Sequence, residues 1–333
     1  MRHFSLILAA ILWSAIACLA SCAHQDATPT QVETKTEQPE ADATDGFSDE
    51  ELLEVGKAYN ARGESEKAVR VLKKAVERKA DWAPALYQLG LAFSRLERIK
   101  EATQALSQAY KLAPEHLETA LLLGMALDLA GQPAKALKVY MGAARVHPNN
   151  PELLHEIGVT LLMLNQGQAA LKALVKAVKL KPKDAELMGD LGYAFMVLGK
   201  QAKAEKVLRR ALAADPNQVP VQMNLARVLL TQKNFKEATD LLIAASRQAP
   251  KQPALWTLLA LAQLRAGHMP EAEQAASQAI KLAPKSARAH FLQGAARDAQ
   301  GKLAEARKAF EQALALDPQL KEASRWLKDH PVK

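Results

Sequence analysis

The chain has 333 residues, of which 49% are hydrophobic and 24% charged, and its formal net charge is +8. Its 15 glycines and 16 prolines are too few for a collagen-like or low-complexity chain, and Leu and Ala outnumber the β-branched residues, which favours helix. An all-β or doubly wound α/β fold is therefore not expected. Because Cys18 and Cys22 both lie near the start, neither a disulfide framework nor a cysteine metal site can stabilise the rest of the chain.

Residues 1–21 have the pattern of a lipoprotein signal peptide. An apolar run from Leu6 to Ala20 is too short to span a membrane and has the length of a secretory signal core. It ends in Leu19-Ala20-Ser21-Cys22, which resembles the bacterial lipobox and implies that Cys22 receives diacylglycerol and a further acyl chain such as palmitate. The alternative is an ordinary signal peptide cut nearby. Ala23, where Gram-negative inner-membrane lipoproteins have Asp, implies the outer membrane, facing the periplasm.

Residues 22–48 are expected to form a disordered tether after the lipidated cysteine. Residues 23–48 contain six acids, one Lys and almost no large apolar side chain. Such a segment buries too little apolar surface to offset the entropy lost on ordering. The tether would let the folded part move relative to the membrane.

From residue 49 the chain repeats every 34 residues without an insertion. The repeat is marked by seven prolines: Pro114, Pro148, Pro182, Pro216, Pro250, Pro284 and Pro318. With this proline at position 32 of each unit, positions 20 and 27 are Ala in all eight units, and position 8 is Gly in six units and Ala in two. Small residues at helical spacing let two helices approach closely, and the proline ends the second helix. The first unit departs by having Ala80 in place of the proline.

This spacing resembles the tetratricopeptide repeat, a helix-turn-helix unit of 34 residues. The resemblance covers residues 49–320 and implies an all-α fold, an α-α superhelix or solenoid of about eight repeats.

The C-terminal end closes the array. Residues 321–333 are expected to form a capping helix in which Trp326 is a packing residue. Gln263, Gln293 and Arg297 occupy positions at which the family prefers apolar residues. This difference predicts looser packing in the last two units.

No motif for catalysis or metal binding occurs in the sequence. The sequence lacks four common motifs of this kind: H-E-x-x-H, G-x-x-x-x-G-K-[ST], G-x-G-x-x-G and G-x-S-x-G. Only 13 residues follow the repeats. We therefore expect no enzyme activity, no cofactor and no metal site.

The repeats carry an excess of positive charge. Residues 49–333 hold 42 Lys and Arg against 30 Asp and Glu, and much of the excess lies on expected second helices. The residues concerned are Lys172, Lys176, Lys179, Lys181, Lys183, Lys203, Lys206, Arg209 and Arg210. A basic face can bind nucleic acid, but few aromatic residues are available for stacking, so no nucleic-acid partner is expected. A solvated convex face is the simpler interpretation, with weak attraction to anionic lipid headgroups as the alternative.

The first helix of each unit is expected to carry the binding surface. In the family these helices line the concave groove, mainly through positions 2, 5, 9, 12 and 13. The resemblance implies partner contacts by Tyr87, Leu91, Leu121, Met125, His155, Val159, Tyr193, Met196 and Met223. This set is largely apolar, and Met adapts to varied partner shapes. Packing of these side chains within the array remains an equal alternative, and His155 also fits a buried core histidine.

These observations predict a membrane-anchored scaffold that binds protein partners in the periplasm. The chain resembles tetratricopeptide lipoproteins that serve as assembly factors for pilus secretins and tight-adherence pili. It also resembles those that scaffold envelope assembly or peptidoglycan hydrolases. The identity of the partner and a homo-oligomeric state are left open.

Overall fold

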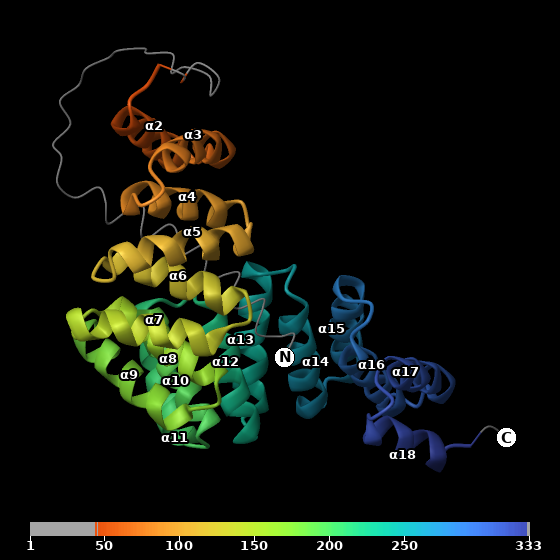
Figure 1. Cartoon of the computed structure of the whole chain (residues 1–333). Coiled ribbons are helices and arrows are strands. Elements are labelled where there is room, and N and C mark those ends of the chain that lie inside the picture. The colour runs from red at the N-terminus through yellow and green to blue at the C-terminus, as the bar shows by residue number, and fades with distance from the viewer. Residues whose placement is uncertain (1–43, 45, 332–333) are drawn as a thin grey trace, which may run out of the picture. The chain divides into compact units, whose positions relative to one another are not determined.

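Helices in pairs make up the chain in the computed structural model, which describes residue 44 and residues 46–331 (Figure 1). Within this part there are seventeen α-helices and no strand. The first helices are α2 (Asp49–Ala61), α4 (Ala83–Arg95), α6 (Leu117–Leu129), α8 (Pro151–Met163), α10 (Ala185–Val197), α12 (Val219–Thr231), α14 (Pro253–Ala266) and α16 (Ala287–Ala299). The second helices are α3 (Ser65–Arg78), α5 (Ile99–Leu112), α7 (Pro133–Val146), α9 (Gly167–Leu180), α11 (Gln201–Ala214), α13 (Phe235–Gln248), α15 (Met269–Leu282) and α17 (Leu303–Leu316), and α18 (Lys321–Asp329) follows.

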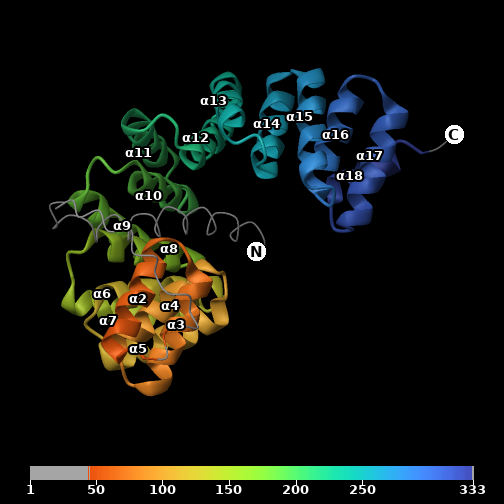
Figure 2. The same ribbon diagram turned by 90° about the horizontal axis from the view of Figure 1, so that it is seen from above.

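The chain divides into two compact units, one up to Ala177 and one from Val178. In the first unit each helix from α2 to α8 packs on the next, and in the second unit the same holds from α10 to α18. Successive first helices also lie side by side, α2 beside α4 and α6 beside α8 in the first unit, and α10 beside α12 and α14 beside α16 in the second (Figures 1 and 2). The expected all-helical solenoid class is confirmed, since each unit is a stack of helix pairs.

Many of the first helices have a polar N-cap residue, which is position 34 of the preceding repeat. The Ser48 hydroxyl accepts a hydrogen bond from the backbone N–H of Glu51, whose carboxylate accepts one from the backbone N–H of Ser48. His116, Asn150, Asp184 and Ser286 cap their helices in the same way through a side chain that accepts from the third backbone N–H. These caps satisfy N–H groups that have no partner inside the helix.

The turn between the two helices of every repeat contains one residue in the left-handed conformation. Its φ angle lies between 57° and 86°, and the residues are Gly63, Glu97, Gly131, Asn165, Gly199, Lys233, Gly267 and Gly301. Glycine and, less readily, asparagine adopt this conformation with little strain, whereas Glu97 and Lys233 are sterically strained in it.

Replacing Lys233 with Gly is expected to raise the free energy of unfolding by about 0.5–1 kcal/mol, because relief of the left-handed strain exceeds the added chain entropy. Urea unfolding followed by circular dichroism would measure the change. The reverse replacement at the equivalent turn, Gly199→Lys, should destabilise the protein by a similar amount. A Lys233→Gly variant no more stable than the parent would contradict the strain argument.

The repeat's small residues form the contacts between helices. All sixteen alanines at positions 20 and 27 are at most 1% exposed. The glycines at position 8 lie against a large side chain at position 24: a Cβ added at Gly90 would lie 2.4 Å from Leu106 Cγ, and one at Gly124 would lie 2.2 Å from the Tyr140 ring. The two helices of a repeat therefore approach as closely as a glycine allows.

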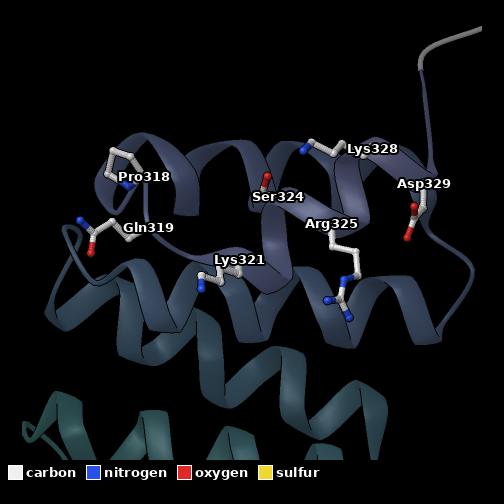
Figure 3. A pocket seen from close by; sticks show the side chains of 7 residues that line it. All are labelled: Pro318, Gln319, Lys321, Ser324, Arg325, Lys328 and Asp329. Atoms are coloured by element: carbon white, nitrogen blue, oxygen red, sulfur yellow. The ribbon is translucent and has the colours of Figure 1, made fainter.

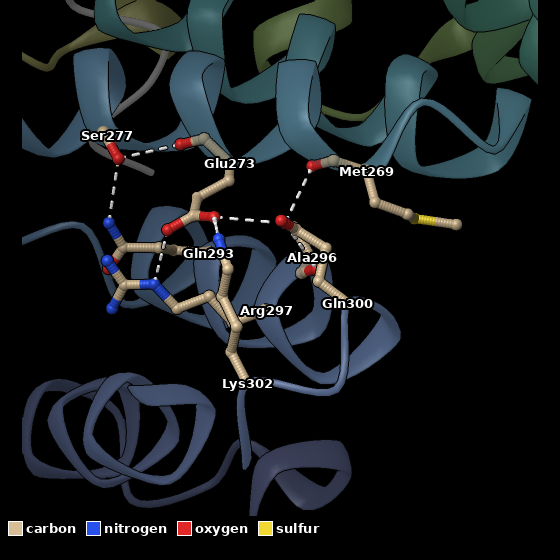
Figure 4. A network of polar contacts seen from close by, with 8 residues as sticks. All are labelled: Met269, Glu273, Ser277, Gln293, Ala296, Arg297, Gln300 and Lys302. Carbon is tan, nitrogen blue, oxygen red and sulfur yellow. Dashed lines mark hydrogen bonds and ion pairs between the residues drawn. The ribbon is translucent and has the colours of Figure 1, made fainter. Parts of the chain in front are cut away.

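In the last two repeats, Gln293 and Arg297 make polar contacts (Figure 4). Gln263, the third residue at which looser packing is expected, is buried, and its Oε1 has no hydrogen-bond partner among the described residues. Arg297 Nε donates to Glu273 Oε1 at 2.7 Å, and Lys302 Nζ lies 3.0 Å from Glu273 Oε2. Gln293 Nε2 donates to the Ser277 hydroxyl at 2.9 Å. The hydrogen bond from Arg297, with those from Lys302 and Gln300, lowers the pKa of Glu273 to about 2. Charged hydrogen bonds here replace the usual apolar contacts.

The last helix, α18, covers the end of α17 with an aromatic cluster. The rings of Phe310 and Trp326 have centroids 4.7 Å apart, and His330 stacks on Trp326 at 4.2 Å. Ala323 is fully buried, and Leu320 and Leu327 pack against the same cluster. Trp326 thus contributes to packing at the end of the array, as expected from the sequence.

Candidate protein-binding surface

In the first unit, the predicted binding residues lie on α4, α6 and α8. Tyr87, Leu91 and Val159 are partly exposed. Leu121 and Met125 are each 6% exposed, and His155 is 7% exposed. In the second unit, Tyr193 and Met196 on α10 are partly exposed, whereas Met223 on α12 is 5% exposed.

Burial separates these residues into two groups. Leu121, Met125, His155 and Met223 are buried in the structure, which fits the alternative that they pack within the array. Tyr87, Leu91, Val159, Tyr193 and Met196 retain surface that a partner could contact. Binding by any of the nine remains a prediction.

Tyr87 contacts an imidazole and is influenced by a nearby carboxylate. Its ring meets the His116 ring edge to face, with centroids 5.3 Å apart. Burial and the negative charge of Glu118 raise the pKa of Tyr87 to about 12. The phenol is therefore neutral at physiological pH and can donate a hydrogen bond from a largely apolar surface.

Acidic side chains occupy the junction of α6, α7 and α8. Thr160 Oγ1 donates to Asp128 Oδ2 at 2.8 Å, while Asp128 Oδ1 is buried without a hydrogen-bond partner among the described residues. Glu156 Oε2 lies 3.5 Å from the Tyr140 hydroxyl, and its Oε1 lies 3.7 Å from His155 Nδ1. Burial, with a smaller contribution from the charge of Glu156, raises the pKa of Asp128 to about 7.

These acids were not among the predicted site residues, because the positive charge of the repeats as a whole conceals them. The charge of each first helix taken separately reveals them. Between them, α6 and α8 carry Glu118, Asp128, Glu152 and Glu156 and no Lys or Arg, although the chain has a net charge of +8. These two helices therefore carry acidic as well as apolar side chains.

The basic side chains on second helices are exposed but partly paired. Arg209 donates to Glu205 at 2.9 Å and to Glu237 at 2.6 Å, and these bonds raise the pKa of the guanidinium. Lys176 donates to the carbonyl of Pro148 at 2.6 Å. Such exposed pairs contribute little to stability, and the geometry fits a solvated face.

A surface hollow of about 590 Å³ lies along α18 (Figure 3). It is lined by Pro318, Gln319, Lys321, Ser324, Arg325, Lys328 and Asp329. All of these except Ser324 are exposed, so the hollow is the solvent face of an amphipathic end helix.

Among the described residues, no helix has both the length and the apolar composition needed to cross a bilayer. No three His, Cys, Asp or Glu side chains in residue 44 and residues 46–331 gather as ligands for a metal ion.

Several solved structures share the fold. A chain of the APC/C hetero-tetramer Cut9-Hcn1 matches 87% of this chain with a TM-score of 0.64 and 16% identity, and this chain spans 57% of its length. A tetratricopeptide repeat protein from Parabacteroides merdae matches 74% of this chain and 97% of its own, with a TM-score of 0.57 and 18% identity. The match with PilF from Pseudomonas aeruginosa covers 63% of this chain and 96% of PilF, with a TM-score of 0.55 and 20% identity. These likenesses establish the fold alone.

The sequence also matches family models, although no curated protein matches it significantly. One model described as a tetratricopeptide repeat matches residues 95–157 and 199–262, and a second matches 156–219 and 257–321. Together they cover residues 95–321 without a gap, and the fold of this family supports a scaffold for protein–protein interaction. The chain belongs to the tetratricopeptide repeat family.

Proposed function

We propose that this protein is a lipid-anchored, non-catalytic scaffold at the outer membrane that binds partner proteins in the periplasm through its first helices. The repeat fold and the partly exposed side chains of Tyr87, Leu91, Val159, Tyr193 and Met196 support the binding role. The location is supported by Leu19-Ala20-Ser21-Cys22 at the end of an apolar run, which lies outside the described residues.

The anchor is tested by a single replacement. Cys22→Ser removes the thiol that would carry the lipid, so we expect an unprocessed or soluble product that no longer fractionates with the outer membrane. Fractionation in high salt, followed by immunoblotting, would measure this. Cys18→Ser is the matched control and should fractionate like the parent. A Cys22→Ser protein that stays with the outer membrane at high salt would exclude a lipid anchor.

The binding role is tested at Tyr193. Tyr193→Ala should weaken the binding of a periplasmic partner, identified by crosslinking, by about 1 kcal/mol or more. Helicity should stay intact, because an aromatic anchor residue contributes more to partner binding than to folding. Quantitative crosslinking and thermal melting would be measured together. Leu303→Ala, which removes a side chain that is 51% exposed on a second helix, is the control.

The nature of the captured partner separates the finer alternatives. A pilus secretin would favour an assembly factor, and a peptidoglycan hydrolase would favour an adaptor for envelope enzymes. If Tyr193→Ala lowers the melting temperature while binding per folded molecule stays unchanged, Tyr193 belongs to the core of the repeats. Failure to capture any partner would argue against the scaffold itself.

A further inference from the structure

The second helix α7 has a solvent-exposed face that carries bases and no acid. Its charged residues are Lys135, Lys138 and Arg145, and all three are exposed. None of them makes an ion pair within the part of the chain that the structure describes. Arg209, on another second helix, instead pairs with Glu205 of its own helix. The positive charge of α7 is therefore not neutralised by the described residues around it.

Two large apolar side chains share this face of α7. Met141 and Val146 are 56% and 57% exposed, which are the highest values for large apolar residues in the described part of the chain. The helical repeat of about 3.6 residues per turn places both on the same side as the three bases. Ala136, Tyr140 and Ala143 lie on the other side and are buried. Bases alone suit a solvated face, whereas this face also exposes apolar surface to water.

The basic surface continues from α7 to α9 within the first unit. Lys176 Nζ donates to the carbonyl of Pro148, two residues after the end of α7, at 2.6 Å. Lys172, one turn earlier on α9, is also exposed, and α9 carries no acid. Five bases on two neighbouring second helices therefore contribute to one surface.

The buried side of α7 packs on first helices. Gly124 of α6 lies against the Tyr140 ring, and the Tyr140 hydroxyl lies 3.5 Å from Glu156 Oε2 of α8. An object that contacts the exposed side of α7 would therefore have α7 between itself and these two first helices. Contact at this side leaves α6 and α8 accessible to a different partner.

We propose that the α7 surface, defined as Lys135, Lys138, Met141, Arg145 and Val146 with Lys172 and Lys176, binds a bilayer that contains anionic phospholipids. Headgroup phosphates neutralise the lysine and arginine side chains. Met141 and Val146 contact the boundary between headgroups and acyl chains. This contact turns the first helices of the first unit away from the membrane, toward partner proteins.

The proposal rests on the proposed lipid anchor at Cys22, because the anchor keeps a bilayer close to the repeats. Residues 23–48 can extend over at most about 90 Å, so the anchored chain stays within reach of the membrane surface. Tethering raises the effective concentration of the bilayer at the α7 surface, so that a weak contact suffices.

A bilayer matches the α7 surface better than other anionic partners do. It presents phosphates beside acyl chains, and so matches bases that alternate with exposed apolar side chains. The backbone of a nucleic acid offers the charge alone. The acids of residues 23–48 could also reach the bases, but that segment has almost no large apolar side chain to cover Met141 and Val146.

Lipid contact at Met141 can be measured on the full-length chain. Replacing Cys18 and Cys22, the two cysteines of the sequence, with Ser lets Met141→Cys supply a single thiol for a fluorescent label. The vesicles are phosphatidylcholine with or without phosphatidylglycerol, and they contain a phospholipid that carries a quenching spin label near its headgroup end. We expect quenching on vesicles with phosphatidylglycerol, little on neutral vesicles, and loss of quenching in high salt.

A charge variant locates the contact on α7. Lys135→Gln/Lys138→Gln/Arg145→Gln should lose the quenching and keep its helicity by circular dichroism, since all three side chains are exposed. The apolar run from Leu6 to Ala20 also favours vesicles, but it is the same in every variant. A difference between variants therefore comes from α7.

Two controls accompany this variant. Lys100→Gln/Lys281→Gln/Lys308→Gln removes as many exposed bases from second helices that also carry acids, and should retain the quenching. A label at Leu303→Cys, where the parent side chain is 51% exposed on α17, should stay unquenched on both kinds of vesicle.

Three results would overturn the inference. The first is equal quenching at residue 141 on charged and neutral vesicles, and the second is quenching that survives in the α7 charge variant. The third is protection of the label from a soluble quencher without vesicles, lost in Glu33→Gln/Glu37→Gln/Glu40→Gln, which would identify the acidic segment as the occupant. None of these results decides the anchor or the scaffold, because neither a lipid at Cys22 nor a partner protein takes part.

Discussion

Replacing Gly124 with Ala is expected to lower the free energy of unfolding by about 1–3 kcal/mol. The added Cβ would lie 2.2 Å from the Tyr140 ring, and Tyr140 is completely buried. The rigid ring can move only with its helix, so α6 and α7 would have to separate. Urea unfolding monitored by circular dichroism would measure the loss of stability.

The sixth repeat offers a matched control for this prediction. It has Ala226 and Leu242 at the positions equivalent to Gly124 and Tyr140, and both are fully buried. Gly124→Ala combined with Tyr140→Leu should therefore be more stable than the sum of the two single changes predicts. Additive effects in this double-mutant cycle would show that the added methyl group does not meet the ring.

Replacing Asp128 with Asn is expected to stabilise the protein at alkaline pH by about 2 kcal/mol or more. Asp128 is 5% exposed, and burial raises its pKa from 3.8 to about 7. The folded state therefore holds this proton more tightly than the unfolded state does, and stability falls as the pH rises from about 4 to about 7. Asn has no charge to bury, and its amide oxygen can still accept from Thr160.

The pH profile distinguishes this explanation from a general change in packing. Thermal melting of the parent and of Asp128→Asn should coincide near pH 4 and diverge up to about pH 7, beyond which the gap stays constant. Asp81→Asn, at an exposed position in the same unit, should follow the parent throughout. A constant gap from pH 4 to 9, or a less stable Asp128→Asn protein above pH 7, would contradict buried charge as the cause.

The two residues differ in how far sequence alone explains them. Gly124 belongs to a repeating pattern of small residues, and the pattern already indicates close helix contact. The partner of that contact, Tyr140, stands where other repeats have Leu, Ala or Phe, and its clash distance needs coordinates. Asp128 has no periodic signal. Its raised pKa results from burial and is modified by Thr160 and Glu156 of the next repeat.

The sequence by itself determined the helix pairs and their register. The 34-residue spacing, the invariant alanines and the prolines specify local geometry and helix ends, which depend on residues near one another in the chain. Tertiary structure alone decided which first-helix side chains keep exposed surface and which are buried. Leu121 and Tyr87 both satisfy the family's groove positions, yet Leu121 is 6% exposed and Tyr87 is partly exposed. The burial of these side chains arises from packing between repeats, where contacts are made with neighbours about 34 residues away. The raised pKa of Asp128 follows from that burial.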